Sequence, residues 1–149
     1  MNVTQKLRNF LNNLGLHHPN NLNYYLQAIT HSSYTNEINS NYPSYDRLEF
    51  LGDDLVKKII SEHLFRLPNN LSEGDMSENM NKLIQESLIA KFAREIKLDQ
   101  QILVGKSIQS LSYKTLSHCF KALIAAIYLD QKGEDFVREL INKTLLTRI

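Results

Sequence analysis

Residues 45–55 read YDRLEFLGDDL, and they carry more information about this protein than any other segment of its 149 residues. An α-helix turns by about 100° per residue, so a helix here would place the carboxylates of Asp46, Glu49 and Asp53 within an arc of roughly 60°. The opposite side of that helix would be apolar and would carry Leu48, Leu51, Leu55 and Ile59. The segment therefore predicts a helix that packs against a core on one side and gathers three negative charges on the other.

Two features argue against a simple solvent-exposed acidic face. Phe50 and Ile60 lie on or near the acidic side, and a helix that is apolar nearly all round is a buried helix. Gly52 lies in the helix interior, where glycine costs about 0.5–1 kcal/mol relative to alanine unless another segment must approach closely. Carboxylates clustered in such a place repel one another and keep their protons unless a cation lies among them. That cation can be a metal ion or a basic side chain.

The segment closely resembles the signature helix of the ribonuclease III family, and the similarity continues along the chain. Residues 28–34 (AITHSSY) resemble the family's threonine-histidine-x-serine-tyrosine segment, and residues 71–77 (LSEGDMS) resemble its glutamate-glycine-aspartate turn. Residues 121–130 (KALIAAIYLD) follow the pattern of its last core helix. Because these matches occur in the family's order and span nearly the whole chain, we expect an all-α fold like that of the ribonuclease III domain.

The resemblance also implies a set of site residues. In ribonucleases III a carboxylate cluster holds magnesium, which activates water to cleave double-stranded RNA. Asp46, Glu49 and Asp53 match the acidic positions of the signature helix. Glu73 matches a further acidic residue, which in family dimers lies near the partner's active centre. The family's two remaining ligands are an aspartate and, three residues later, a glutamate just before an alanine-leucine-isoleucine run.

This chain departs from the family at those last two positions, where it has His118 and Lys121. Magnesium prefers hard oxygen ligands in octahedral geometry, and an ammonium group in place of a carboxylate removes one ligand and repels the ion. A histidine can bind a softer metal, but Lys121 would still oppose it. We therefore predict that Lys121 forms an ion pair with Glu49 or Asp53, which keeps the carboxylates charged without magnesium. If a metal is bound at all, the resemblance assigns it to Glu49 and Asp53.

Three classes of function stay open on these residues. The first, which the replaced ligands favour, is a cleavage-deficient module that binds double-stranded or structured RNA or packs beside ribosomal proteins in a ribonucleoprotein such as a mitochondrial ribosome. The second is the non-catalytic subunit of a heterodimer, in which Glu73 completes the site of an active ribonuclease III-like subunit. The third is an active endonuclease that uses Asp46, Glu49, Asp53 and His118 with Mg²⁺ or Mn²⁺. We expect no cofactor unless the third class holds.

By the same resemblance, the domain should dimerise through the signature helix. Family domains form a two-fold dimer, as a homodimer or with another ribonuclease III-like subunit, and duplex RNA lies in the valley between the two copies. Phe50 would then be an interface residue, since burial across a dimer axis explains an aromatic side chain on the polar side of a helix. His31 matches a family position beside the signature helix, and we expect it to have a structural hydrogen-bonding role.

Composition fits one domain over residues 1–149. With 42% hydrophobic residues the chain can bury one sizeable core, and we expect no double-stranded RNA-binding domain to follow it. Its 17 Lys plus Arg against 16 Asp plus Glu give a net charge of +1, so affinity for phosphate should be modest and sensitive to salt. The candidates for RNA contacts are Lys57, Lys58, Lys106 and Lys114.

The remaining signals concern the compartment and the first helix. Cys119 is the single cysteine and no apolar run is long enough to span a membrane, so we expect a soluble protein of a reducing compartment, cytoplasmic or mitochondrial. The N-terminal stretch superficially resembles a mitochondrial presequence. Its apolar residues nevertheless fit a first core helix that ends at Gly15; these residues are Leu7, Phe10, Leu11 and Leu14.

Local signals predict several further boundaries. Ser72 with Asp75 suggests the N-terminal cap of a helix, and a helix should restart at Ser87 and continue through Ile96. Residues 101–112 should form a loop, and the last helix should run from about residue 134 to residue 146. No segment shows the alternating pattern of a β-strand.

Overall fold

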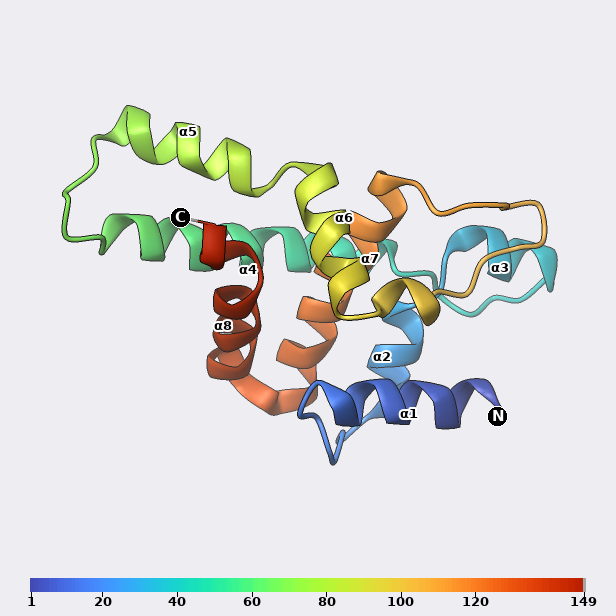
Figure 1. The fold of residues 1–149 in the computed structure, drawn as a ribbon. Coiled ribbons are helices and arrows are strands. Elements are labelled where there is room, and N and C mark those ends of the chain that lie inside the picture. The colour runs from blue at the N-terminus through green and yellow to red at the C-terminus, as the bar shows by residue number, and fades with distance from the viewer. Residues whose placement is uncertain (149) are drawn as a thin grey trace.

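The computed structural model describes residues 1–148, and helices joined by short connections make up its regular structure (Figure 1). The described residues contain no β-strand, only an isolated bridge between Thr30 and Leu103. The α-helices are α1 (Val3–Asn13), α2 (Leu22–Ala28), α3 (Ser32–Glu37), α4 (Asp46–Phe65), α5 (Glu73–Leu83), α6 (Glu86–Glu95), α7 (Tyr113–Ile127) and α8 (Gly133–Lys143). The predicted all-α fold is thereby confirmed. Shorter helical turns cover Leu98–Gln100, Tyr128–Lys132 and Leu145–Arg148.

Several helix ends follow the local signals in the sequence. Helix α1 ends at Asn13, and Leu14 is its C-terminal cap residue. Gly15 comes next and has a φ of +95°, a conformation that glycine adopts without strain. The Ser72 side chain accepts a hydrogen bond from the Asp75 amide at the start of α5, as predicted. Residues 101–112 form the predicted loop, apart from the single-residue bridge at Leu103.

Three predicted boundaries were wrong by one to three residues, namely both ends of the helix predicted over 87–96 and the end of the last helix. Helix α6 starts at Glu86, one residue before the predicted Ser87, with Gln85 as its N-terminal cap residue. Helix α8 ends at Lys143 and not at residue 146. The backbone leaves helical geometry at Thr144, where φ is −107° and ψ is −86°, so the helix cannot continue beyond this residue. Leu145 still reaches the core beyond this break, because it is fully buried.

The core is built around α7. Every residue of this helix from Cys119 to Ile127 is buried, which is the pattern of a helix enclosed on all sides. Helices α2, α4, α6 and α8 pack against α7 and supply the surrounding apolar side chains (Figure 1). As expected for a small buried residue, Cys119 is fully buried, and its thiol donates a hydrogen bond to the Ala28 carbonyl. Burial raises the pKa of this thiol, so Cys119 is not a reactive nucleophile.

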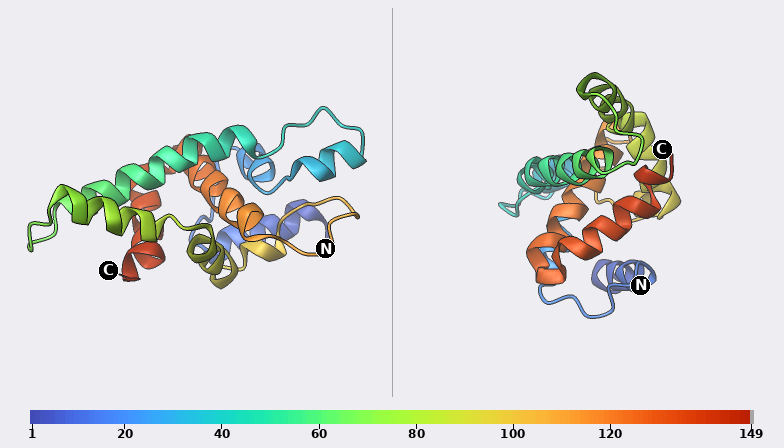
Figure 2. Two further views of the ribbon diagram at one scale, coloured as in Figure 1. Left: turned by 90° about the horizontal axis from the view of Figure 1, so that it is seen from above. Right: turned by 90° about the vertical axis from the view of Figure 1, so that its left-hand side faces the viewer.

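Helix α5 contrasts with α7. It lies alongside the second half of α4 at one edge of the molecule (Figure 2), and Leu83 is its only buried residue. Helix α4 packs mainly on α7, and α2, α5 and α8 also contact it. Among the described residues, no helix combines the length and the apolar character needed to span a membrane.

Candidate functional site

The candidate site lies where α4 crosses α7. A Cβ atom built on Gly52 would lie 1.8 Å from the carbonyl oxygen of Lys121 and 2.5 Å from its carbonyl carbon. The two backbones are therefore in direct contact, which no side chain at residue 52 would allow. This contact explains a glycine in the middle of a long helix, and it brings the side chains of α7 against the acidic side of α4.

Lys121 uses this position to form the predicted ion pair, and its partner is Asp53. Their Nζ and Oδ1 atoms are 2.9 Å apart. The Lys121 side chain is 9% exposed and the Asp53 side chain is 27% exposed, so the pair is largely shielded from water. Although partial burial of Asp53 raises its pKa, hydrogen bonds from Lys57 and Lys121 outweigh that effect and hold the pKa below the usual value. The carboxylate is therefore charged, and its counter-ion belongs to the protein.

His118, one turn before Lys121, faces Glu49. The His118 Nε2 and Glu49 Oε1 atoms are 3.9 Å apart, which is longer than a hydrogen bond. The Tyr45 ring lies beside His118, edge to face, with ring centroids 6.4 Å apart, and the His31 ring lies 5.7 Å from Tyr45. Burial raises the pKa of Tyr45 to about 12. Tyr45 thus links the two histidines, a role that we did not predict from the sequence.

The remaining predicted acidic residues lie outside this ion pair. Asp46 is exposed at the start of α4 and accepts a 3.0 Å hydrogen bond from the Ser44 hydroxyl. Glu73 is exposed at the start of α5, where it accepts a 3.5 Å hydrogen bond from Ser77. Within one chain, therefore, α5 does not bring Glu73 into the cluster formed by α4 and α7.

His31 has the structural role that we expected. Its Nδ1 accepts a 3.1 Å hydrogen bond from the Ser33 amide at the start of α3, and the same atom lies 2.7 Å from the Ser33 hydroxyl oxygen. The Ser33 hydroxyl in turn accepts a 2.9 Å hydrogen bond from the Gly105 amide. This chain of contacts fastens the loop before α7 to α3, and so positions the start of the helix that carries His118.

The residues present do not fit the magnesium site that the resemblance implies. His118 and Lys121 replace two of the expected carboxylates, and the Lys121 ammonium occupies Asp53 Oδ1, one of the oxygens that a metal would need. Residues 1–148 also contain no group of three or more His, Cys, Asp or Glu side chains arranged to hold a metal ion. The site is thus an acidic cluster neutralised from within by a basic side chain.

The four candidate lysines for RNA contacts fall into two groups. On α4, Lys57 lies 2.9 Å from Asp53 and Lys58 lies 2.6 Å from Glu134, so both are engaged in ion pairs. Lys106 and Lys114 are exposed, one in the loop before α7 and the other in its first turn. The ion pair between Lys57 and Asp53 is predictable from the sequence, because residues four apart on a helix lie next to each other on its surface.

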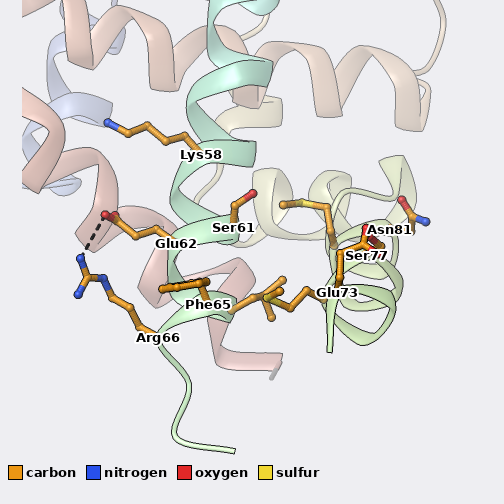
Figure 3. Close-up of a pocket in the computed structure, with 11 residues that line it drawn as sticks. Lys58, Ser61, Glu62, Phe65, Arg66, Glu73, Ser77 and Asn81 are labelled. Carbon is orange, nitrogen blue, oxygen red and sulfur yellow. Dashed lines mark hydrogen bonds and ion pairs between the residues drawn. The ribbon is translucent and has the colours of Figure 1, made fainter. Parts of the chain in front are cut away.

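A cavity of about 740 Å³ lies between the C-terminal end of α4 and α5 (Figure 3). Phe65 projects from α4 on one side, and Glu73 and two methionines, Met76 and Met80, line it from α5. Phe65 is 76% exposed, and Phe50, four turns earlier on the same helix, is 75% exposed. Two large aromatic side chains on one helix thus lack a covering partner among the described residues.

The chain is similar to known proteins of one family. Residues 21–149 match the model of the Ribonuclease-III-like family. Proteins named Ribonuclease 3 are 43% identical to this chain over 129 residues in Mycoplasmoides gallisepticum and 36% identical over 149 residues in Staphylococcus epidermidis. The first alignment covers 85% of this chain and 19% of the relative, and the second covers 97% and 60%. The chain therefore spans less than two thirds of the length of these relatives.

Solved structures show the same relationship. The nuclease domain of ribonuclease III from Campylobacter jejuni superposes with a TM-score of 0.81 and 27% sequence identity, over 94% of this chain and 99% of that domain. A second structure of that domain gives a TM-score of 0.80 and 26% identity over 100% and 97% of the two chains. With a family model that matches most of its length and a fold shared with these nuclease domains, the chain belongs to the ribonuclease III-like family.

Proposed function

We propose that this chain is a ribonuclease III-like domain that does not cleave RNA and that serves as a dimeric module for binding double-stranded or structured RNA. The observation that carries this proposal is the Lys121 ammonium, which lies 2.9 Å from Asp53 at a position where the family has a metal-binding glutamate. The natural setting can be a ribonucleoprotein, including a mitochondrial ribosome in which ribosomal proteins are neighbours.

Loss of cleavage follows from charge and coordination. A divalent cation at Asp53 would have to displace a nearly buried ammonium group, and it would find a histidine in place of a second carboxylate. Magnesium requires near-octahedral oxygen coordination, which Glu49 and Asp53 alone supply only in part. Without the metal nothing in this cluster lowers the pKa of a water molecule or stabilises the leaving oxygen.

The exposed aromatic residues of α4 support a dimer. Phe50 and Phe65 are 15 residues apart, so they lie within about 60° of each other around the helix and about 22 Å apart along it. A two-fold axis between them would bring Phe50 of one copy towards Phe65 of the other and the adjacent cavity. One structure of the Campylobacter jejuni domain is described as showing structural flexibility in the region involved in dimer formation.

A cleavage assay tests the loss of activity directly. The purified protein is incubated with labelled duplex RNA in Mg²⁺ and then in Mn²⁺, with the Ribonuclease 3 of Staphylococcus epidermidis as the active control. We expect intact RNA in both metals and retarded migration of the duplex at low salt, because contacts with phosphate weaken as salt rises. Products with two-nucleotide overhangs that depend on Asp53 would overturn the proposal.

Two alternatives each have a specific observation behind them. The relatives named Ribonuclease 3 favour an active Mg²⁺-dependent endonuclease, which the same assay tests. The exposed Glu73 at the edge of the α4–α5 cavity favours the non-catalytic subunit of a heterodimer, which would offer this carboxylate to an intact partner. Purification from the natural source separates the proposed ribonucleoprotein from the heterodimer. A ribonucleoprotein yields ribosomal RNA, whereas a heterodimer yields a complete ribonuclease III subunit.

A further inference from the structure

Asp53 is held by two ammonium groups and not by one. Its Oδ1 atom is 2.9 Å from Lys121 Nζ, and its Oδ2 atom is 2.9 Å from Lys57 Nζ. Lys121 comes from α7, whereas Lys57 comes from α4 itself, one turn after Asp53. Both oxygens of the carboxylate therefore already have a positively charged partner.

The second contact matters for any cation that approaches this cluster. A divalent ion binds a carboxylate oxygen at about 2.0–2.6 Å, so it would compete with an ammonium group for the same lone pairs. Even if carboxylates replaced His118 and Lys121, the Lys57 charge would remain on Oδ2. A like charge at this distance disfavours the ion through direct repulsion, and more strongly where water is partly excluded.

An ordinary surface pair would behave differently. An ion pair between residues four apart on an exposed helix contributes only about 0.3–0.5 kcal/mol, and a cation would displace it easily. The Lys57 side chain is 45% exposed, but the carboxylate that it contacts is only 27% exposed, so water and salt screen this pair less than a pair of fully exposed groups.

We propose that Lys57 is a second internal counter-ion of the former metal site, so that two lysines of this chain exclude a divalent cation. Restoration of the two lost ligands alone therefore leaves the affinity of the site for a divalent cation reduced by the Lys57 charge. This inference rests on the proposed loss of the metal and adds to it a residue that the family pattern does not mark.

Manganese binding tests the inference, with isothermal titration calorimetry as the readout. Two variants are compared: H118D/K121E, and the same pair with K57S. We expect addition of Lys57→Ser to tighten Mn²⁺ binding by about threefold to tenfold, because it removes one neighbouring positive charge. Mn²⁺ is the probe because carboxylate oxygens suit this ion, while sites with nitrogen and oxygen ligands generally bind it more weakly than other first-row metals. A gain in Mn²⁺ affinity therefore reflects the restored carboxylates.

Lys58→Ser in the same double variant is the matched control. It removes one ammonium group from the next residue of the same helix, where the partner is Glu134 and not Asp53. Circular dichroism checks that each variant is folded. If H118D/K121E is unfolded without metal, the comparison is repeated with H118D/K121Q, which adds one negative charge fewer.

Each outcome decides the inference. Equal Mn²⁺ affinity with and without Lys57→Ser contradicts it, as does an equal gain from Lys58→Ser or a lack of binding in the variant that carries Lys57→Ser. The proposed function fails in a different way, through Mn²⁺ or Mg²⁺ binding and RNA cleavage by the unmodified protein. The two failures are therefore distinguishable.

Discussion

The ion pair between Lys121 and Asp53 can be dissected with three variants: Lys121→Met, Asp53→Asn and the two together. Methionine keeps the length of the lysine stem without the charge, and asparagine keeps the shape of aspartate. The two residues differ in exposure, at 9% for the Lys121 side chain and 27% for Asp53. They also differ in the charged partner that remains after one substitution. Asp53 keeps Lys57 when the Lys121 charge is removed, whereas Lys121 has no second carboxylate partner among its ion pairs in residues 1–148.

The magnitudes follow from this asymmetry. At the observed 2.9 Å, the direct attraction is roughly 6 kcal/mol for an effective dielectric constant of about 20. Desolvation of the two groups offsets most of it. Asp53→Asn leaves a nearly buried ammonium group without its charged partner and should lower the free energy of unfolding by about 2–3 kcal/mol. Lys121→Met should lower it by only about 1–2 kcal/mol. The double variant should be no less stable than Asp53→Asn alone, which gives a coupling of about 1–2 kcal/mol.

Urea unfolding followed by circular dichroism at pH 7 and 25 °C, in the presence of a chelator, measures these differences. For a chain of this size each 1 kcal/mol corresponds to about 2–4 °C in Tm, so thermal unfolding offers an independent check. Additive effects of the two single substitutions, within about 0.3–0.5 kcal/mol, would refute the reasoning, since residues in a real ion pair do not act independently. A large loss of stability on addition of chelator to the unmodified protein would also refute it, because the structural cation would then be a metal.

The stability that the Asp53 carboxylate contributes should depend on pH. The pKa of Asp53 is lowered in the folded protein, so its ionised form contributes stability at pH values above the usual carboxyl pKa of about 4. This contribution is lost as the pH falls through the lower value of the folded state. The stability difference between the unmodified protein and Asp53→Asn should therefore be full at pH 7 and should shrink below about pH 4. A difference that stays constant down to pH 2 would contradict the assigned pKa direction.

Three further predictions concern other parts of the fold. Gly52→Ala should destabilise the protein by about 3 kcal/mol or more despite the better helix propensity of alanine, because its Cβ would overlap the backbone of Lys121; a gain in stability would contradict the close approach. Phe50→Ala should convert a dimer into a monomer in analytical ultracentrifugation, and a stable dimer would show that the interface lies elsewhere. Asp130→Asn should lower the free energy of unfolding in urea by about 2 kcal/mol, and by more than Tyr25→Phe does. The reason is that the buried Asp130 carboxylate accepts hydrogen bonds from two backbone amides as well as from the Tyr25 hydroxyl, so equal losses in the two variants would contradict this.

The sequence predicts the fold class and the charge pattern well, since both depend on local periodicity. The spacing of Asp46, Glu49 and Asp53 fixes them to one side of α4, and the apolar residues between them fix the opposite side to the core. Gly52 in the helix interior predicts a close approach, although not by which segment. The exchange of two carboxylates for His118 and Lys121 is visible only because the chain resembles a family whose pattern is known.

Other features depend on contacts between residues far apart in the chain, and no local pattern encodes them. Residue spacing on α4 leaves Glu49 and Asp53 as equal partners for Lys121, and the crossing of α4 and α7 at Gly52 selects Asp53. The same crossing leaves His118 3.9 Å from Glu49. Distances of this kind are set by how two helices pack, because a shift of one turn along either helix would exchange the partners while both helices kept the same residues, the same charges and the same periodicity.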